Sequence, residues 1–177
     1  MFVYIRIMSR TRLVPDAEIF ALILGQLAEG GEKAVTFASV AAVSGLAAPT
    51  LVQRYGSRDA MVVSAVADLW DRLDAATEAV EAEALASAKG ALGMLKALSD
   101  LAGTPEFLAI SMRDQGLRAR AEAWRMTVET ALAKRLGGGA KGHDAGAALF
   151  AMWQGRLMWD RAGGKGFKLW DAAKRLA

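Results

Sequence analysis

Residues 36–61 read TFASVAAVSGLAAPTLVQRYGSRDAM, and this stretch decides the fold. Two glycines divide it, because Gly45 and Gly56 each favour the end of a helix and a tight turn. Thr36 and Ser57 are residue types that favour the N-cap of a helix. The pattern therefore predicts two short helices followed by a long one. Two short helices joined by a glycine-containing turn form a helix-turn-helix arrangement, in which the second helix enters the major groove of DNA.

Apolar residues at helical spacing predict further helices on both sides of this stretch, and glycine or proline marks most of their boundaries. The chain shows no strand pattern and no internal repeat. We therefore expect an all-α fold of about nine helices, with a flexible glycine-rich loop over 137–142. The expected helices cover about 15–30, 36–44, 48–55, a long helix from Ser57, 84–101, a short helix from Thr104, a long helix through 117–132, 143–162 and 167–176.

The composition agrees with a helical protein and excludes several kinds of chemistry. The 177 residues include 37 alanines and only 3 prolines, and alanine is the best helix former. With no cysteine and His143 as its single histidine, the chain has no disulfide, no thiolate nucleophile and no histidine–cysteine metal site. The sequence contains no nucleophile–base pair and no phosphate-binding loop. We therefore expect no enzymatic activity, no metal site and no cofactor.

Charge and hydropathy indicate less about binding partners than the helix-turn-helix pattern does. The net charge is +3, with an acidic stretch over 68–83 and a basic one over 141–177, so charge by itself does not predict DNA binding. No apolar run reaches the roughly 18 residues of a membrane-spanning helix, and we expect a soluble, cytoplasmic protein without membrane contact. Met8 resembles a second start, which raises the hypothesis that residues 1–7 do not belong to the native chain.

The stretch 36–61 resembles the N-terminal domain of the tetracycline-repressor (TetR-type) family. The family pattern has Thr, three residues and Ile-Ala, then Ala-Gly-Val-Ser, then Thr-Leu-Tyr, then Phe-Gly-Ser-Lys-Glu-Ala-Leu, and this sequence follows it without a gap. The resemblance implies a DNA-binding domain over 1–60 and a helical effector-binding and dimerisation domain over 61–177. The matching residues are Thr36, Val40-Ala41, Gly45, Thr50-Leu51 and Tyr55-Gly56-Ser57-Arg58-Asp59-Ala60-Met61.

The resemblance also implies which residues meet DNA. Thr50, Gln53 and Arg54 would project towards the duplex, and Arg58 would hold a phosphate. Glutamine suits adenine, and arginine offers a forked set of donors. Two positions depart from the family: Val52 replaces a tyrosine whose hydroxyl touches phosphate, and Ala47 replaces a serine cap. The expected DNA-binding residues are Thr36, Ala47, Ala48, Pro49, Thr50, Gln53, Arg54 and Arg58.

Aromatic and methionine residues in the middle of the chain are either plain core or the wall of a small-molecule pocket. The family holds its effector among these helices, and Met and aromatic side chains suit an adaptable apolar pocket. Few charges lie among them, which favours a hydrophobic or aromatic effector. The expected pocket residues are Trp70, Met94, Phe107, Met112, Trp124 and Met126.

The last two expected helices carry more apolar surface than a monomer usually exposes. The resemblance implies a twofold dimer through a four-helix bundle, and an isologous interface is the commonest solution. The expected interface residues are Leu149, Met152, Trp153, Gly155, Leu157, Trp159 and Trp170.

These patterns together predict a ligand-responsive transcriptional repressor. It would bind a palindromic operator as a homodimer and be released by a small hydrophobic or aromatic effector. The alternative, favoured by Val52 and Ala47, is a helical ligand-binding or interaction module whose DNA-reading head has degenerated.

Overall fold

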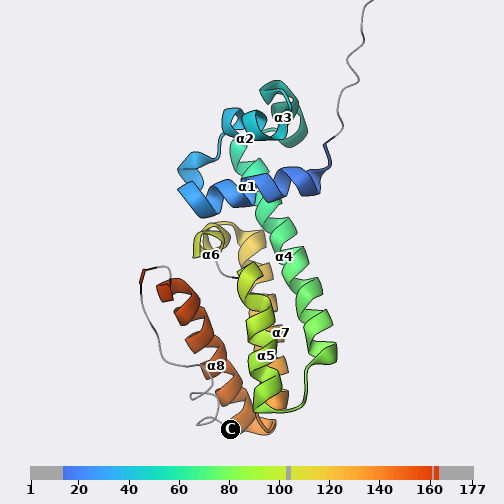
Figure 1. The fold of residues 1–177 in the computed structure, drawn as a ribbon, viewed down its shortest axis with the longest axis vertical. Helices are drawn as coiled ribbons and strands as arrows, with labels where there is room; N and C mark the ends of the chain where they lie inside the picture. Colours follow the sequence, from blue (N-terminus) through green and yellow to red (C-terminus); the bar gives the residue numbers. More distant parts are fainter. Residues whose placement is uncertain (1–13, 103–104, 161, 164–177) are drawn as a thin grey trace, which may run out of the picture.

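The computed structural model describes residues 14–102, 105–160 and 162–163 and confirms an all-α fold for them (Figure 1). Within these ranges the chain forms eight α-helices and one 3-10 helix, without strands. The expected helix over 167–176 lies outside the described residues. The elements are α1 (Asp16–Gly30), η1 (Glu32–Ala34), α2 (Phe37–Ser44), α3 (Ala48–Tyr55), α4 (Arg58–Glu83), α5 (Ala88–Ala102), α6 (Pro105–Arg113), α7 (Gln115–Arg135) and α8 (Gly139–Asp160).

Local capping signals place the short N-terminal helices as the sequence predicted. The Thr36 hydroxyl accepts a hydrogen bond from the Ser39 backbone N–H at 3.0 Å, and the Ser39 hydroxyl accepts one from the Thr36 N–H at 2.9 Å. This reciprocal pair is a capping box. Gly45 ends α2 with φ of 72°, a left-handed conformation that favours glycine. Ser57 caps α4 by accepting from the Ala60 N–H at 3.0 Å.

Helix α4 joins the N-terminal helices to the rest of the molecule. Its first part packs against α1 and α3, and it continues along α5 and α7 (Figure 1). An apolar stripe along it is buried, at Met61, Ala65, Leu69 and Leu73. One continuous helix therefore contacts both the N-terminal helices and the helices α5 and α7.

Two helix boundaries differ from the sequence prediction. Helix α5 begins at Ala88 and not at residue 84, because the Ser87 hydroxyl accepts from the Gly90 N–H at 3.2 Å and caps the helix there. Helix α8 begins at Gly139 and not at His143, so most of the expected loop over 137–142 is helical. Glycine is a poor helix former, but here it lets α8 lie directly on α7.

The contact between α7 and α8 depends on two of these glycines. A Cβ at Gly146 would lie 2.7 Å from the backbone oxygen of Glu129, and one at Gly142 would lie 2.9 Å from that of Ala133. Neither oxygen can move without shifting α7 itself. The low side-chain volume of these positions therefore sets the separation of the two helices.

Candidate DNA-contact surface and ligand cavity

One face of α3 is exposed and polar. Leu51 is fully buried and anchors the helix, whereas Pro49, Thr50 and Gln53 are exposed. Val52 is 44% exposed, so the valine that replaces the family tyrosine lies on this outer surface. The expected contact residues Thr36 and Ala47 are also exposed, while Ala48 is half-buried. Ala47 precedes α3 without a side-chain cap, as its methyl group requires.

Arg54 holds α3 against α1. Its Nη1 donates to the Val14 carbonyl at 2.8 Å, and its Nε lies 3.2 Å from Oδ1 of Asp16. The Tyr55 hydroxyl donates to the same carboxylate. Burial, and then the hydrogen bond to Asp16, raise the pKa of Tyr55 above its usual range, so the hydroxyl remains a donor. The DNA contact expected of Arg54 therefore competes with an intramolecular one.

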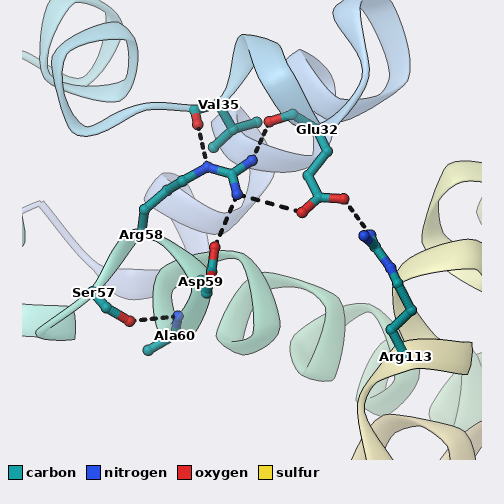
Figure 2. Close-up of polar contacts among 7 residues, drawn as sticks. All are labelled: Glu32, Val35, Ser57, Arg58, Asp59, Ala60 and Arg113. Atoms are coloured by element: carbon teal, nitrogen blue, oxygen red, sulfur yellow. Dashed lines mark hydrogen bonds and ion pairs between the residues drawn. The ribbon is translucent and has the colours of Figure 1, made fainter.

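Arg58 is engaged in a similar way, as Figure 2 shows. Its Nε donates to the Val35 carbonyl at 2.8 Å and its Nη2 to the Glu32 carbonyl. Its Nη1 lies 2.9 Å from Oδ1 of Asp59 and 3.3 Å from Oε1 of Glu32. The guanidinium thus fastens the segment before α2 to the start of α4. The phosphate contact expected of Arg58 would therefore compete with these intramolecular contacts, because its donors already have protein acceptors.

The carboxylate of Glu32 also contacts α6. Its second carboxylate oxygen accepts from Arg113 at the end of α6 (Figure 2). The hydrogen bond from Arg113 lowers the pKa of Glu32, burial opposes this effect, and Arg58 lowers the pKa further. One carboxylate therefore joins η1, α4 and α6.

We expect the stability contribution of Glu32 to depend on pH. Because its pKa is lowered from a usual 4.5 on folding, the contribution is present above about pH 5 and is lost as the pH falls through the lowered value. Glu32→Gln should cost roughly 1 kcal/mol at pH 7, and the difference from wild type should shrink below about pH 4. Urea unfolding at both pH values measures it, with exposed Glu78→Gln as the control. A pH-independent difference would contradict this assignment.

A cavity of 460 Å³ lies among α4, α5, α6, α7 and α8. Four of the expected pocket residues line it: Trp70, Phe107, Met112 and Trp124. The other residues that line the cavity come from five helices and were not predicted from the sequence. Several of them are small or charged. These are Leu69, Leu73, Leu101, Ala102, Pro105, Leu108, Arg118, Ala121, Glu122, Arg125, Phe150, Gln154, Leu157 and Met158.

The other two expected pocket residues lie elsewhere. Met94 is fully buried in the core and does not reach the cavity wall. Met126 is 56% exposed on the solvent side of α7. Both residues were predicted from residue type, which marks an apolar environment, but the direction of a side chain around its helix decides which environment it meets.

The deep wall of the cavity is apolar and aromatic. The Trp70 and Trp124 rings lie 5.6 Å apart, and Phe150 packs edge-on against Trp124 at 5.8 Å. The Trp70 indole N–H donates to the Ser111 hydroxyl at 3.0 Å, and that of Trp124 donates to Thr77 at 2.9 Å. These indole donors are thus satisfied by the protein and are not offered to a ligand.

The residues expected at a dimer interface divide between two environments. Leu149 is fully buried and Trp153 is 1% exposed, both within the protomer, so their side chains are unavailable to a partner. Leu157 lines the cavity. Met152 and Gly155 are half-buried, while Trp159 is 65% exposed. Trp170 lies outside the described residues. The apolar periodicity of α8 predicted an apolar helix. One of its apolar faces is buried in the core of the protomer and is not exposed to a partner.

Comparisons with known proteins agree with this architecture. No protein-family model matches the sequence, and no curated protein does. Among solved structures, the crystal structure of a transcriptional regulator from Rhodococcus sp. Rha1 superposes with a TM-score of 0.73 at 20% sequence identity. The match covers 92% of this chain and 94% of that one. The chain therefore has the fold of that regulator. In the described part of the chain, no helix is long and apolar enough to cross a membrane.

Proposed function

We propose that this chain is a ligand-responsive transcriptional regulator of the TetR type. It binds a palindromic operator as a homodimer in the cytoplasm and acts as a repressor. A small hydrophobic or aromatic effector in the cavity releases it from DNA. The observation that carries the proposal is the arrangement of α4, which starts beside the exposed helix α3 and whose Trp70 lines an apolar cavity.

The proposed DNA surface is the outer face of α3. Gln53 is exposed and has no hydrogen bond to any described residue, so its amide is free to pair with a base edge. Thr50 is exposed one turn earlier and adds a hydroxyl. Pro49 offers apolar contact to thymine methyl groups. Arg54 holds α3 against α1, and Arg58 holds the segment before α2 against the start of α4, through the contacts described above.

Gln53→Ala is expected to relax base preference. A bidentate glutamine–adenine pair is worth about 1–3 kcal/mol of discrimination, so the variant should lose roughly five- to 150-fold preference at one position of each half-site. Binding to selected duplexes with single-base changes measures this. Gln115→Ala is the matched control, since Gln115 is equally exposed but lies on α7. Unchanged preference in Gln53→Ala would remove Gln53 from the interface.

The proposed ligand response runs through α4 and α6. Helix α6 carries Phe107 and Met112 in the cavity wall and ends in Arg113, which pairs with Glu32. A ligand that displaces α6 or α4 therefore changes the support of the N-terminal helices. An ordinary allosteric coupling is about 1–3 kcal/mol, so a saturating effector should weaken operator binding roughly five- to 150-fold. Unchanged operator affinity with a filled cavity would contradict the ligand response.

A dimer would place two α3 helices on half-sites about one helical turn apart, or a multiple of that distance. The exposed side chains of Met158 and Trp159, next to the open position at Gly155, favour the C-terminal part of α8 as its interface.

A second candidate is a helical ligand-binding or interaction module with a degenerate head. Val52, which lacks a phosphate-binding hydroxyl, and the internal pairing of Arg54 and Arg58 favour it. The two candidates differ in whether the protein selects a DNA sequence, and selection from random duplexes distinguishes them.

A further inference from the structure

We infer that the cavity binds an organic anion, with an apolar body inside and an anionic head held by Arg118. This inference rests on the proposed effector site and narrows its chemistry from any hydrophobic molecule to an amphipathic carboxylate or an equivalent anion. Three features of the cavity support it: the indole donors in its interior are already bonded to the protein, its volume is limited, and the side chain of Arg118 at the rim has no protein partner.

The interior selects an apolar body. The indole donors of Trp70 and Trp124 are bonded to Ser111 and Thr77, and the remaining deep lining is aliphatic or aromatic. A polar group buried there would lose its hydrogen bonds to water without replacement, which is unfavourable.

The volume limits the size of that body. A cavity of 460 Å³ lies in the lower half of the range of roughly 300–1,000 Å³ that is usual for small-molecule sites. This suits a medium-length alkyl chain or two fused or linked aromatic rings. A larger molecule would have to extend beyond the rim.

The charged rim selects the head group. The exposed lining residues include Arg118, Glu122 and Arg125, all on α7, and the half-buried Gln154 of α8 also lines the cavity. Arg125 is paired with Glu129 at 2.9 Å. Of the arginines in the described ranges, Arg118 is the one whose side chain makes no hydrogen bond or ion pair to the protein.

A free guanidinium at the rim matches an anion in both charge and geometry. Its fork can donate two parallel hydrogen bonds to a carboxylate, and such charge-assisted bonds are about twice as strong as neutral ones. Glu122 opposes an anion and Arg125 is already paired with Glu129, so the inference assigns the head group to the guanidinium of Arg118 alone. Gln154 can donate a further hydrogen bond from its amide.

The test compares acids with their amides, so that only the charge of the head changes. Dodecanoate and biphenyl-4-carboxylate are the two anionic probes, and dodecanamide and biphenyl-4-carboxamide are their neutral counterparts. Binding to the full chain is measured by calorimetry without DNA. We expect at least one acid to bind about tenfold or more tightly than its amide. The acid that binds identifies an aliphatic or an aromatic body.

Two variants assign the preference to a residue. Arg118→Gln should remove the preference for the acid while leaving the unfolding midpoint and the affinity for the amide unchanged. Arg156→Gln, on the outer side of α8 and away from the cavity, should retain the preference. Amides that bind as tightly as acids, an Arg118→Gln protein that still prefers acids, or no binding of any probe would each overturn the inference.

The same probes separate this inference from the proposed regulation. Acids that bind through Arg118 without changing DNA affinity would support the ligand class and contradict the ligand response. Amides that bind equally well and release DNA would do the opposite.

Discussion

Arg58→Ala is expected to lower the free energy of unfolding by about 2–4 kcal/mol, because the half-buried guanidinium joins the segment 32–35 to the start of α4. It donates to the backbone carbonyls of Val35 and Glu32 and pairs with the Glu32 carboxylate. Hydrogen bonds to charged groups contribute roughly 1.5–3 kcal/mol each, and part of this is regained from water at a position that is about one-third exposed. Chemical unfolding followed by circular dichroism measures the loss.

The control is Arg72→Ala, which removes an exposed arginine paired with Asp68 one turn away on α4. Such a pair is worth about 0.5 kcal/mol. Arg58→Lys should recover little, because an ammonium group cannot serve two carbonyls and a carboxylate with a planar fork. An Arg58→Ala protein of unchanged stability that loses DNA affinity and has a shallower salt dependence would show the opposite: that Arg58 binds phosphate and is not a clamp.

Gly146→Ala is expected to lower the free energy of unfolding by about 2–3 kcal/mol. The added Cβ would lie 2.7 Å from the Glu129 oxygen and 3.0 Å from the Ala133 nitrogen, both backbone atoms of α7. Only a separation of α7 from α8 relieves this contact. Because Phe150, one turn later, lines the cavity, the same separation should alter ligand binding.

Gly155→Ala is the matched control on the same helix, since a Cβ there meets no atom within 4 Å. Its expected effect on the protomer is a gain of up to about 1 kcal/mol from helix propensity. Equal stability of the two alanine variants in urea would contradict the close packing of α7 on α8.

The helix-turn-helix region could be predicted from sequence because its signals are local. Thr36, Gly45 and Ser57 act within three or four residues of themselves, through a cap or a left-handed turn. The partners of Arg58 could not be predicted in this way. Glu32 lies 26 residues before Arg58, and its other partner, Arg113, lies on another helix, so only the tertiary arrangement brings the three residues together.

The distinction between local signals and contacts that depend on the tertiary arrangement also applies to α8 and to the cavity. Apolar periodicity predicted that α8 packs against something, but not that Leu149 and Trp153 face the protomer core while Trp159 faces outward. Residue type predicted four members of the cavity wall. It gave no indication of Arg118, because a charged residue on α7 is recognised as a rim residue only when α8 is in place.

Selection of bound sequences from a pool of random DNA duplexes, at two salt concentrations, tests the central claim most directly. The proposed regulator should enrich one palindrome and bind it more weakly as salt rises. With Arg54 and Arg58 engaged internally, the slope should be shallow and correspond to roughly two to four phosphates per subunit. No enrichment, even at low salt, would contradict sequence-specific DNA binding and establish the chain as a helical module with a degenerate head.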